Sequence, residues 1–236
     1  MKVSVISANM GGYEAQAVWP TLAAPAGVEI EVHRLTDADL PRRHLAMTPR
    51  LKCGLPKMFG HEMFPGADAY VWIDASCTPT PRAVGWFLER LGPKADFALF
   101  AHPERRSVRE EMAFMADRMA RPGESYLTSR YAGEDFDGVW RWFEREAGWQ
   151  GTIRSRRSSI YADDRLFAST AFAYRASRRP HVAAMLSEWW LTKTRWLLHD
   201  QVSLPLLLWL HGCSVSVIQD DYLRCEALTF TRRRGR

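Results

Sequence analysis

The chain has 236 residues, of which 47% are hydrophobic, and this length and composition predict one globular domain, which we place at residues 1–231. A formal net charge of +5 and a pI of about 9.2 favour anionic partners such as nucleotide diphosphates, acidic glycans, membrane surfaces or nucleic acid. The longest apolar run, residues 202–210, is too short to span a bilayer, and the four cysteines lack CxxC spacing, so composition excludes a transmembrane protein, a zinc ribbon and a redox pair. We expect a cytoplasmic location with at most peripheral membrane contact, and a disordered basic tail at residues 232–236.

The pattern of the first third of the chain predicts strands that are joined by a glycine loop and a helix. Residues 2–7 and 28–32 alternate with period two and predict two strands, with the Gly11-Gly12-Tyr13 loop between them. A helix is expected at residues 51–61. The apolar run at residues 69–73 then predicts a strand that is buried on both faces, as in a parallel sheet.

The next elements continue the alternation of helix and strand. The Thr80-Pro81 pair is typical of a helix N-cap followed by proline at the first helical position, and Gly92 predicts the end of that helix. Residues 97–100 predict a strand. Ser107 and Glu110 have capping-box spacing for a further helix.

The second half of the chain is less regular. Residues 121–164 mix Gly, Asp, Arg and Trp, and we interpret them as a lid or an excursion on the acceptor side. A strand is expected at 166–174, helices at 181–190 and 203–211, and a last strand at 214–218. The whole pattern predicts an α/β fold in which helices cover both faces of a mixed, mostly parallel sheet.

Asp74 is the first candidate for chemistry. It follows the apolar strand at 69–73 directly, and open α/β sheets bind ligands at the carboxyl ends of their strands. An acid there can hold a divalent cation that bridges a diphosphate. The alternative is that Asp74 only caps the turn after the strand.

Three spaced blocks of sequence carry a resemblance to a known family. They lie at residues 49–74, 99–111 and 189–205, and include Pro49-Arg50, Lys57, the 70–74 strand, His102-Pro103, Trp189-Trp190 and Asp200-Gln201. In this order they resemble the glycosyltransferase-like family that includes plant mucilage-related proteins and bacterial and phage sequences. The resemblance covers roughly residues 1–220.

The resemblance implies a single-domain, GT-A-like and Rossmann-like fold and a hexosyl- or pentosyltransferase that uses a nucleotide-sugar donor, UDP-sugar foremost. It assigns the residues of the 8–13 loop to the base and ribose, namely Ala8, Asn9, Gly11, Gly12 and Tyr13. Arg50 and Lys57 would bind the diphosphate, which suits the guanidinium fork and the ammonium charge. Asp74 would be catalytic and hold Mn²⁺ or Mg²⁺, with Ser76 beside the donor, where many GT-A enzymes have a second acid.

Asp200 is the second catalytic candidate. A carboxylate can deprotonate the acceptor hydroxyl or stabilise an oxocarbenium-like centre. Because Pro205 is unfavourable inside a helix, we expect the helix to begin near Ser203 and to leave Asp200 and the donor-binding candidate Gln201 exposed before it. The alternative for Asp200 is a helix cap.

Several other residues have both a structural and a functional interpretation. His102 is expected on the ligand edge of the sheet, near the donor sugar or a phosphate. Glu110 suits a capping role at the helix start, and for Glu111 both a structural and a functional role stay possible interpretations. Trp189, Trp190 and Trp196 are expected in the core, and His211 near a helix C-terminus is left out of the metal site.

The sequence is compatible with more than one kind of acceptor. A glycan or lipid-linked saccharide is preferred, and the clustered arginines at positions 154, 156, 157, 178 and 179 also permit DNA that carries a hydroxymethylated base. A non-catalytic nucleic-acid-binding module is a rival, although the sequence has no helix-turn-helix, zinc-finger or RNP signature. A nucleotide hydrolase is disfavoured by the absence of a GxxxxGK[ST] loop and a G-x-S-x-G elbow.

Overall fold

A computed structural model of the chain describes residues 1–12, 17–41, 47–120, 165–195 and 199–230, together with residues 138 and 141. The predicted tail, nearly all of the predicted lid, Tyr13 and Trp196 lie outside these ranges.

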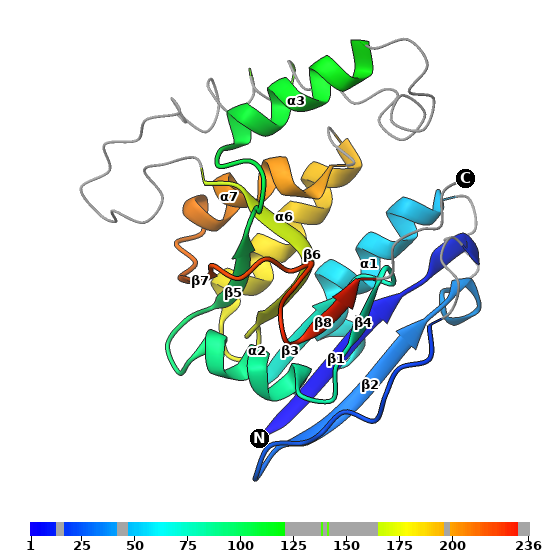
Figure 1. The fold of residues 1–236 in the computed structure, drawn as a ribbon. Helices are drawn as coiled ribbons and strands as arrows, with labels where there is room; N and C mark the ends of the chain where they lie inside the picture. Colours follow the sequence, from blue (N-terminus) through cyan, green and yellow to red (C-terminus); the bar gives the residue numbers. More distant parts are fainter. Residues whose placement is uncertain are drawn as a thin grey trace.

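The central sheet has six strands in the order β2-β1-β3-β6-β5-β7 (Figure 1). β1 pairs in parallel with β2 and β3, and β5 with β7, whereas β6 runs antiparallel to both of its neighbours, β3 and β5. The mixed, mostly parallel sheet is therefore confirmed. The strands are β1 (Lys2–Ala8), β2 (Glu29–Leu35), β3 (Ala69–Ile73), β5 (Phe97–Ala101), β6 (Phe167–Tyr174) and β7 (Val215–Ile218).

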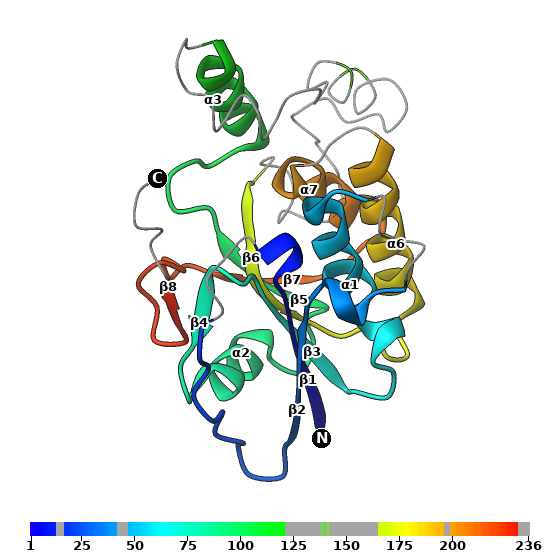
Figure 2. The same ribbon diagram turned by 90° about the vertical axis from the view of Figure 1, so that its right-hand side faces the viewer.

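Helices cover both faces of this sheet, as predicted. α1 (Pro49–Met63), α6 (Pro180–Arg195) and α7 (Asp200–Leu210) lie on one face, and α2 (Ala83–Leu91) lies on the other (Figure 2). Because side chains alternate along a strand, Tyr70 and Trp72 of β3 pack in the core under α1 and α6, and Val71 and Ile73 pack in the core under α2. α3 (Val108–Ala120) lies beyond the carboxyl ends of β1, β3 and β5 (Figure 1).

A small second sheet corrects the predicted start of α2. β4 (Cys77–Pro79) pairs antiparallel with β8 (Leu228–Phe230), and the sequence analysis missed both strands. Thr80 continues this pairing, since its hydroxyl donates to the carbonyl oxygen of Glu226 at 2.8 Å. Thr80 is therefore not the N-cap of α2, which begins only at Ala83, although Gly92 does end that helix.

Two helices on the other face begin earlier than predicted. α1 starts at Pro49, because the Thr48 hydroxyl accepts a hydrogen bond from the Leu51 N–H at 3.3 Å and caps the helix. α7 starts at Asp200 instead of near Ser203, with Pro205 in its second turn. Proline at that position removes a single backbone hydrogen bond, so the helix tolerates it, and Asp200 becomes a first-turn acid.

The carboxyl edge of the parallel strands is where the predicted site residues meet. The 3₁₀ turn η1 (Met10–Gly12) follows β1, Asp74 follows β3 and His102 follows β5. Across the described ranges, no helix is long and apolar enough to cross a bilayer.

Candidate active site

Asp74 leaves its carboxylate available at the end of β3. Its backbone closes the turn, since the Cys77 N–H donates to the Asp74 carbonyl oxygen at 2.9 Å and the Asp74 N–H donates to the Thr170 carbonyl of β6 at 2.8 Å. The carboxylate Oδ1 accepts a hydrogen bond from the Trp72 indole N–H at 2.7 Å. The side chain is 36% exposed. Because the backbone makes the turn, the turn-cap role does not account for the carboxylate.

Lys57 connects Asp74 to Asp200. Its Nζ atom lies 2.8 Å from Asp200 Oδ2 and 3.8 Å from Asp74 Oδ1. It also donates to the Ser169 hydroxyl of β6 at 3.2 Å. The Lys57 side chain is only 6% exposed, so α1 holds a nearly buried ammonium group between the two carboxylates.

Asp200 is fixed by contacts to both its carboxylate and its backbone carbonyl. Lys193 of α6 forms an ion pair with Oδ1, Lys57 holds Oδ2, and the Trp189 indole N–H donates to the Asp200 backbone carbonyl at 3.0 Å. Its side chain is 13% exposed. The prediction that Asp200 is exposed is therefore wrong, because α7 begins at this residue and its first turn packs against α6.

The electrostatics of this cluster separate the two carboxylates. Burial raises the pKa of Asp200, but the ammonium groups of Lys193 and Lys57 outweigh it and hold that pKa well below its usual range. Burial raises the pKa of Asp74 above its usual value, and Lys57 offsets this only in part. Asp200 is thus a fixed anion, whereas Asp74 is the better proton acceptor.

The two lysines also differ. Burial lowers the pKa of Lys57, but the charges of Asp200 and Asp74 more than restore it, so the net direction is upward. Burial lowers the pKa of Lys193, and Asp200 does not fully compensate. The positive charge of Lys57 and, to a smaller extent, that of Arg50 add to this lowering of the Lys193 pKa.

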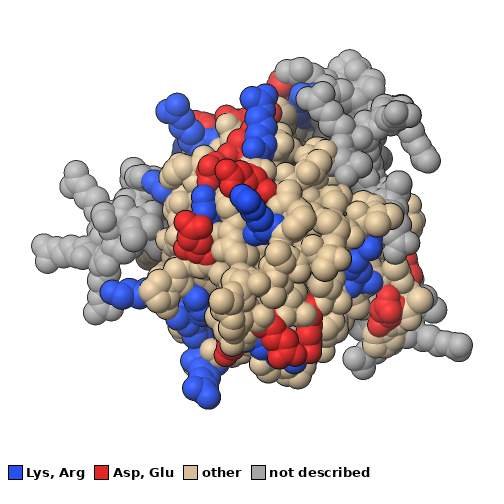
Figure 3. Space-filling view, turned by 60° about the horizontal axis from the view of Figure 1, so that its bottom comes forward, with Lys and Arg blue, Asp and Glu red and all other residues tan. Residues whose placement is uncertain are grey.

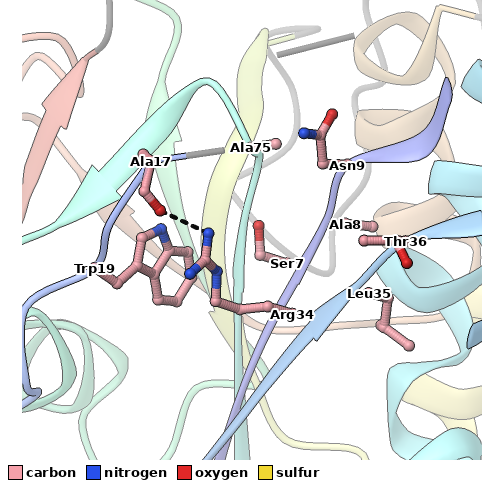
Figure 4. A pocket seen from close by; sticks show the side chains of 9 residues that line it. All are labelled: Ser7, Ala8, Asn9, Ala17, Trp19, Arg34, Leu35, Thr36 and Ala75. Atoms are coloured by element: carbon pink, nitrogen blue, oxygen red, sulfur yellow. Dashed lines mark hydrogen bonds between the residues drawn. The ribbon is translucent and has the colours of Figure 1, made fainter. Parts of the chain in front are cut away.

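A hollow adjoins this cluster at the ends of β1 and β2 (Figure 4). The Arg34 guanidinium lies 5.1 Å from the centre of the Trp19 ring and donates to the Ala17 carbonyl at 2.7 Å. The hollow is small, with a volume of about 20 Å³, and it combines the Trp19 ring, the Arg34 cation that lies over that ring, and strand-end backbone. It is lined by Ser7, Ala8, Asn9, Ala17, Trp19, Arg34, Leu35, Thr36 and Ala75.

The glycine turn beside the hollow is fixed by Asp37. One carboxylate oxygen accepts from the Gly11 N–H, and the other lies 2.6 Å from Lys52 Nζ of α1. Gly11 has a φ of +70°, and an added Cβ would lie 2.7 Å from Pro49 Cγ. The turn therefore requires glycine for both its conformation and its close approach to α1.

Substituting Gly11 with Ala is expected to lower the free energy of unfolding by about 1–2 kcal/mol, because Cβ is strained in the left-handed region and contacts Pro49. Urea unfolding followed by circular dichroism measures this. Gly12→Ala is the matched control, since Gly12 has φ +61° but no atom within 4 Å of the added Cβ. Equal losses in both variants would show that the contact with Pro49 has no effect.

A second network joins β5, α3 and α7. Glu111 of α3 accepts from Arg105 Nε and lies 2.8 Å from His199 Nε2. The Arg105 N–H in turn donates to His102 Nδ1 at 3.0 Å. Burial raises the pKa of Glu111, but His199 and Arg105 reverse this and lower it. Since His199 and Asp200 are consecutive, the two networks meet at the start of α7.

The structure brings most of the predicted site residues to one edge. Asp74, Lys57 and Asp200 form one cluster. Ala8 and Asn9 line the hollow, and Gly11 and Gly12 lie in the 3₁₀ turn beside it. His102 belongs to the second network. Ser76 and Gln201 are half-buried beside Asp74 and Asp200, and Tyr13 lies outside the described residues.

Sequence reasoning missed several residues of the site: Trp19, Arg34, Ser169, Lys193, Arg105 and His199. One signal was available, because Lys193 lies four residues after Trp189 and therefore on the same face of its helix. The predicted core position of Trp189 is confirmed, since it is fully buried.

No family model and no curated protein matches this chain. Among solved structures, the chain is similar to mouse xyloside xylosyltransferase 1 in its apo form, with a TM-score of 0.48 and 12% identity over 92% of this chain and 85% of that one. It is also similar to a glycosyltransferase involved in the glycosylation of the major capsid of PBCV-1, with a TM-score of 0.39 and 8% identity over 92% of this chain and 81% of that one. Both neighbours are glycosyltransferases, but both scores are below 0.5, so the function has to be argued from the site.

The described residues do not by themselves fit a divalent cation. Among them, no group of three or more His, Cys, Asp or Glu side chains is placed to hold a metal ion. The predicted ligand Asp74 already accepts from Trp72 and faces the Lys57 ammonium at 3.8 Å. Because Mg²⁺ needs about six oxygen ligands, one such carboxylate is not a dedicated site.

Proposed function

We propose that this chain is a GT-A-type glycosyltransferase that moves a sugar from a nucleotide-diphosphate-sugar donor, with UDP-sugar as the first candidate, to an acceptor hydroxyl of a glycan or lipid-linked saccharide. The observation that carries the proposal is the Asp74-Lys57-Asp200 cluster at the carboxyl edge of the sheet, directly beside the hollow at β1 and β2. Open α/β sheets bind ligands at this edge.

The hollow has a volume of only about 20 Å³, so in this proposal the nucleoside lies across its mouth and not inside it. Trp19 would contact the base there beside Arg34, and the strand-end residues Ala8 and Asn9 would lie beside the ribose. The diphosphate then extends toward Arg50 and Lys57. Their charges stabilise the negative charge that develops on the departing nucleotide.

The two carboxylates take different parts in this proposal. Asp200 stays ionised between Lys57 and Lys193, so it is a poor proton acceptor, and in this proposal it positions the two ammonium groups at the edge of the site. Asp74, with its raised pKa and more exposed carboxylate, is the group that would take the proton from the acceptor hydroxyl. No step is assigned to a metal ion.

A panel of UDP-, GDP-, CMP- and dTDP-sugars in a thermal-shift assay, with and without Mn²⁺, tests the proposal. A UDP-sugar is expected to raise the melting temperature, since a ligand at 100 times its Kd stabilises the fold by about 2.7 kcal/mol. Trp19→Ala is expected to lose most of this shift, whereas Val18→Ala, at a neighbouring side chain that is 91% exposed and does not line the hollow, keeps it. If no nucleotide sugar shifts the melting temperature under any condition, the transferase proposal fails.

Of the clustered arginines that permit a DNA acceptor, none is described at the edge of the site. Arg154, Arg156 and Arg157 lie outside the described ranges, and Arg178 and Arg179 lie at the opposite edge, where Arg179 pairs with Asp96 just before β5. Figure 3 brings forward the bottom of the view in Figure 1, away from α3, and there acidic and basic side chains are interspersed. A saccharide stays the acceptor that we propose.

A further inference from the structure

A second cavity, of about 680 Å³, opens at the end of β5 and β7, on the other side of the sheet edge from the nucleoside hollow. The two cavities share no lining residue. This second cavity, which we call the arginine cavity, is lined by Ala101, His102, Pro103, Glu104, Arg105, Arg106, Ser107, Arg165, Leu166 and Gln219.

Two of its arginines are presented by paired backbone segments. Ser107 forms an antiparallel bridge with Arg165, and the Leu166 N–H donates to the Arg106 carbonyl at 3.0 Å. Arg106 and Arg165 therefore enter the cavity from neighbouring positions on two hydrogen-bonded strands of chain. Their placement is fixed by main-chain contacts at the end of the sheet.

Among the described residues that line the cavity, these two arginines carry the net charge. Arg105 is neutralised by Glu111 and by Glu104, the latter at 2.8 Å. Within the described ranges, no carboxylate forms an ion pair with the side chain of Arg106 or Arg165, and the nearby Glu110 carboxylate instead accepts from the Arg106 backbone N–H at 2.7 Å. His102 adds no full charge, because burial, and next the charge of Arg105, lower its pKa.

We propose that the arginine cavity binds a phosphate group of the acceptor, so that the acceptor is a phosphate-bearing saccharide. Two guanidinium groups that form no ion pair with a described carboxylate match a phosphate monoester, which carries about −1.5 to −2 at pH 7, whereas a sugar carboxylate would balance only one of them. Guanidinium groups also bind phosphate oxygens through two parallel hydrogen bonds.

The position of the cavity agrees with an acceptor role. Its residue Arg105 contacts Glu111, which contacts His199, and His199 immediately precedes Asp200 of the catalytic cluster. The phosphate would thus lie across the cluster from the nucleoside hollow. That the bound saccharide is an acceptor rests on the proposed transferase function, whereas phosphate binding in the arginine cavity does not depend on that function.

Isothermal titration calorimetry on the full chain tests the phosphate site, with glucose 1-phosphate as the probe and with UDP absent or in excess. Glucose 1-phosphate is expected to bind in both conditions, and methyl glucoside and glucuronate are expected to bind at least about tenfold more weakly. Arg106→Gln and Arg165→Gln should each raise the Kd about tenfold, which is typical of losing a charged hydrogen bond. Arg82→Gln, an exposed arginine that lines neither cavity, is the matched control and should leave the Kd unchanged.

Three results would overturn the inference. The first is displacement of glucose 1-phosphate by UDP, which would put the phosphate in the donor site. The second is binding of glucuronate as tight as that of glucose 1-phosphate. The third is an unchanged Kd for glucose 1-phosphate in the Arg106→Gln/Arg165→Gln double variant. Inorganic phosphate binding as tightly as glucose 1-phosphate would also count against a saccharide ligand. Failure of the nucleotide-sugar panel would remove the transferase proposal and leave arginine-dependent phosphate binding as a separate finding.

Discussion

Replacing Asp200 with Asn is expected to lower the free energy of unfolding by about 3–5 kcal/mol, the usual cost of removing one partner from a buried ion pair. Lys57 and Lys193 are 6% and 3% exposed, and Asp200 is the carboxylate closest to both. Without the Asp200 carboxylate, Lys57 keeps Asp74 at 3.8 Å as its described ion-pair partner and the uncharged Ser169 hydroxyl at 3.2 Å, and Lys193 loses the ion pair with Asp200. Urea unfolding at pH 7, followed by circular dichroism, measures the loss.

The ion-pair origin of this loss has two controls. Lys193→Met combined with Asp200→Asn should cost less than the sum of the two single changes, because the residues act on each other directly. The second control is pH. The folded-state pKa of Asp200 lies below its unfolded value of about 3.9, so its stabilisation is present above pH 4 and is lost as the pH falls further. The gap between native protein and variant should therefore shrink below pH 4, and a gap that is constant down to pH 2 would contradict this origin.

Replacing Asp74 with Asn is expected to reduce the rate of sugar transfer by about 10²–10⁴-fold, the range for loss of a general base, while the fold persists. The amide oxygen can still accept from the Trp72 indole N–H, and the backbone of residue 74 still closes the turn. The turnover number with the donor identified by the panel, together with the unfolding midpoint, separates chemistry from stability.

Asp68→Asn is the matched control for this experiment. Asp68 is an exposed acid just before the other end of β3, where it accepts from the Lys2 N–H at 2.8 Å. It should lose little activity, since it is at the opposite edge of the sheet. A full transfer rate in Asp74→Asn would assign Asp74 to structure alone and leave the reaction without its proposed base.

The sequence predicted the strands of the large sheet well because each is an apolar or alternating run. It did not predict the direction of β6, since the pattern of residues 167–174 reads the same for either direction. It also missed β4 and β8, which have three residues each and are too short to show a period. The predicted start of α7 near Ser203 is too late because it assumes that Pro205 lies in the first turn, whereas Pro205 lies in the second.

The site was predictable only where a residue follows a strand or falls in a family-like block. Asp74 met both conditions, and Lys57 and Asp200 met the second. Ser169 lies inside β6 and reaches Lys57 only because that strand is antiparallel, which brings its early residues to the carboxyl edge. Trp19 lies in a loop and Arg34 in a half-exposed strand, so the sequence pattern does not predict their contact, which forms only in the folded chain.

The late position of β6 has a consequence for synthesis of the chain. β3 and β5 are both complete by residue 101, but in the described sheet they are joined only through β6, at residues 167–174. While a ribosome adds the intervening residues at about 5–20 per second, the nascent chain holds two apolar strands whose inner edges have no partner. Native pairing can therefore be completed only after the last third of the chain has begun to emerge, and until then these edges are available to chaperones and to other nascent chains.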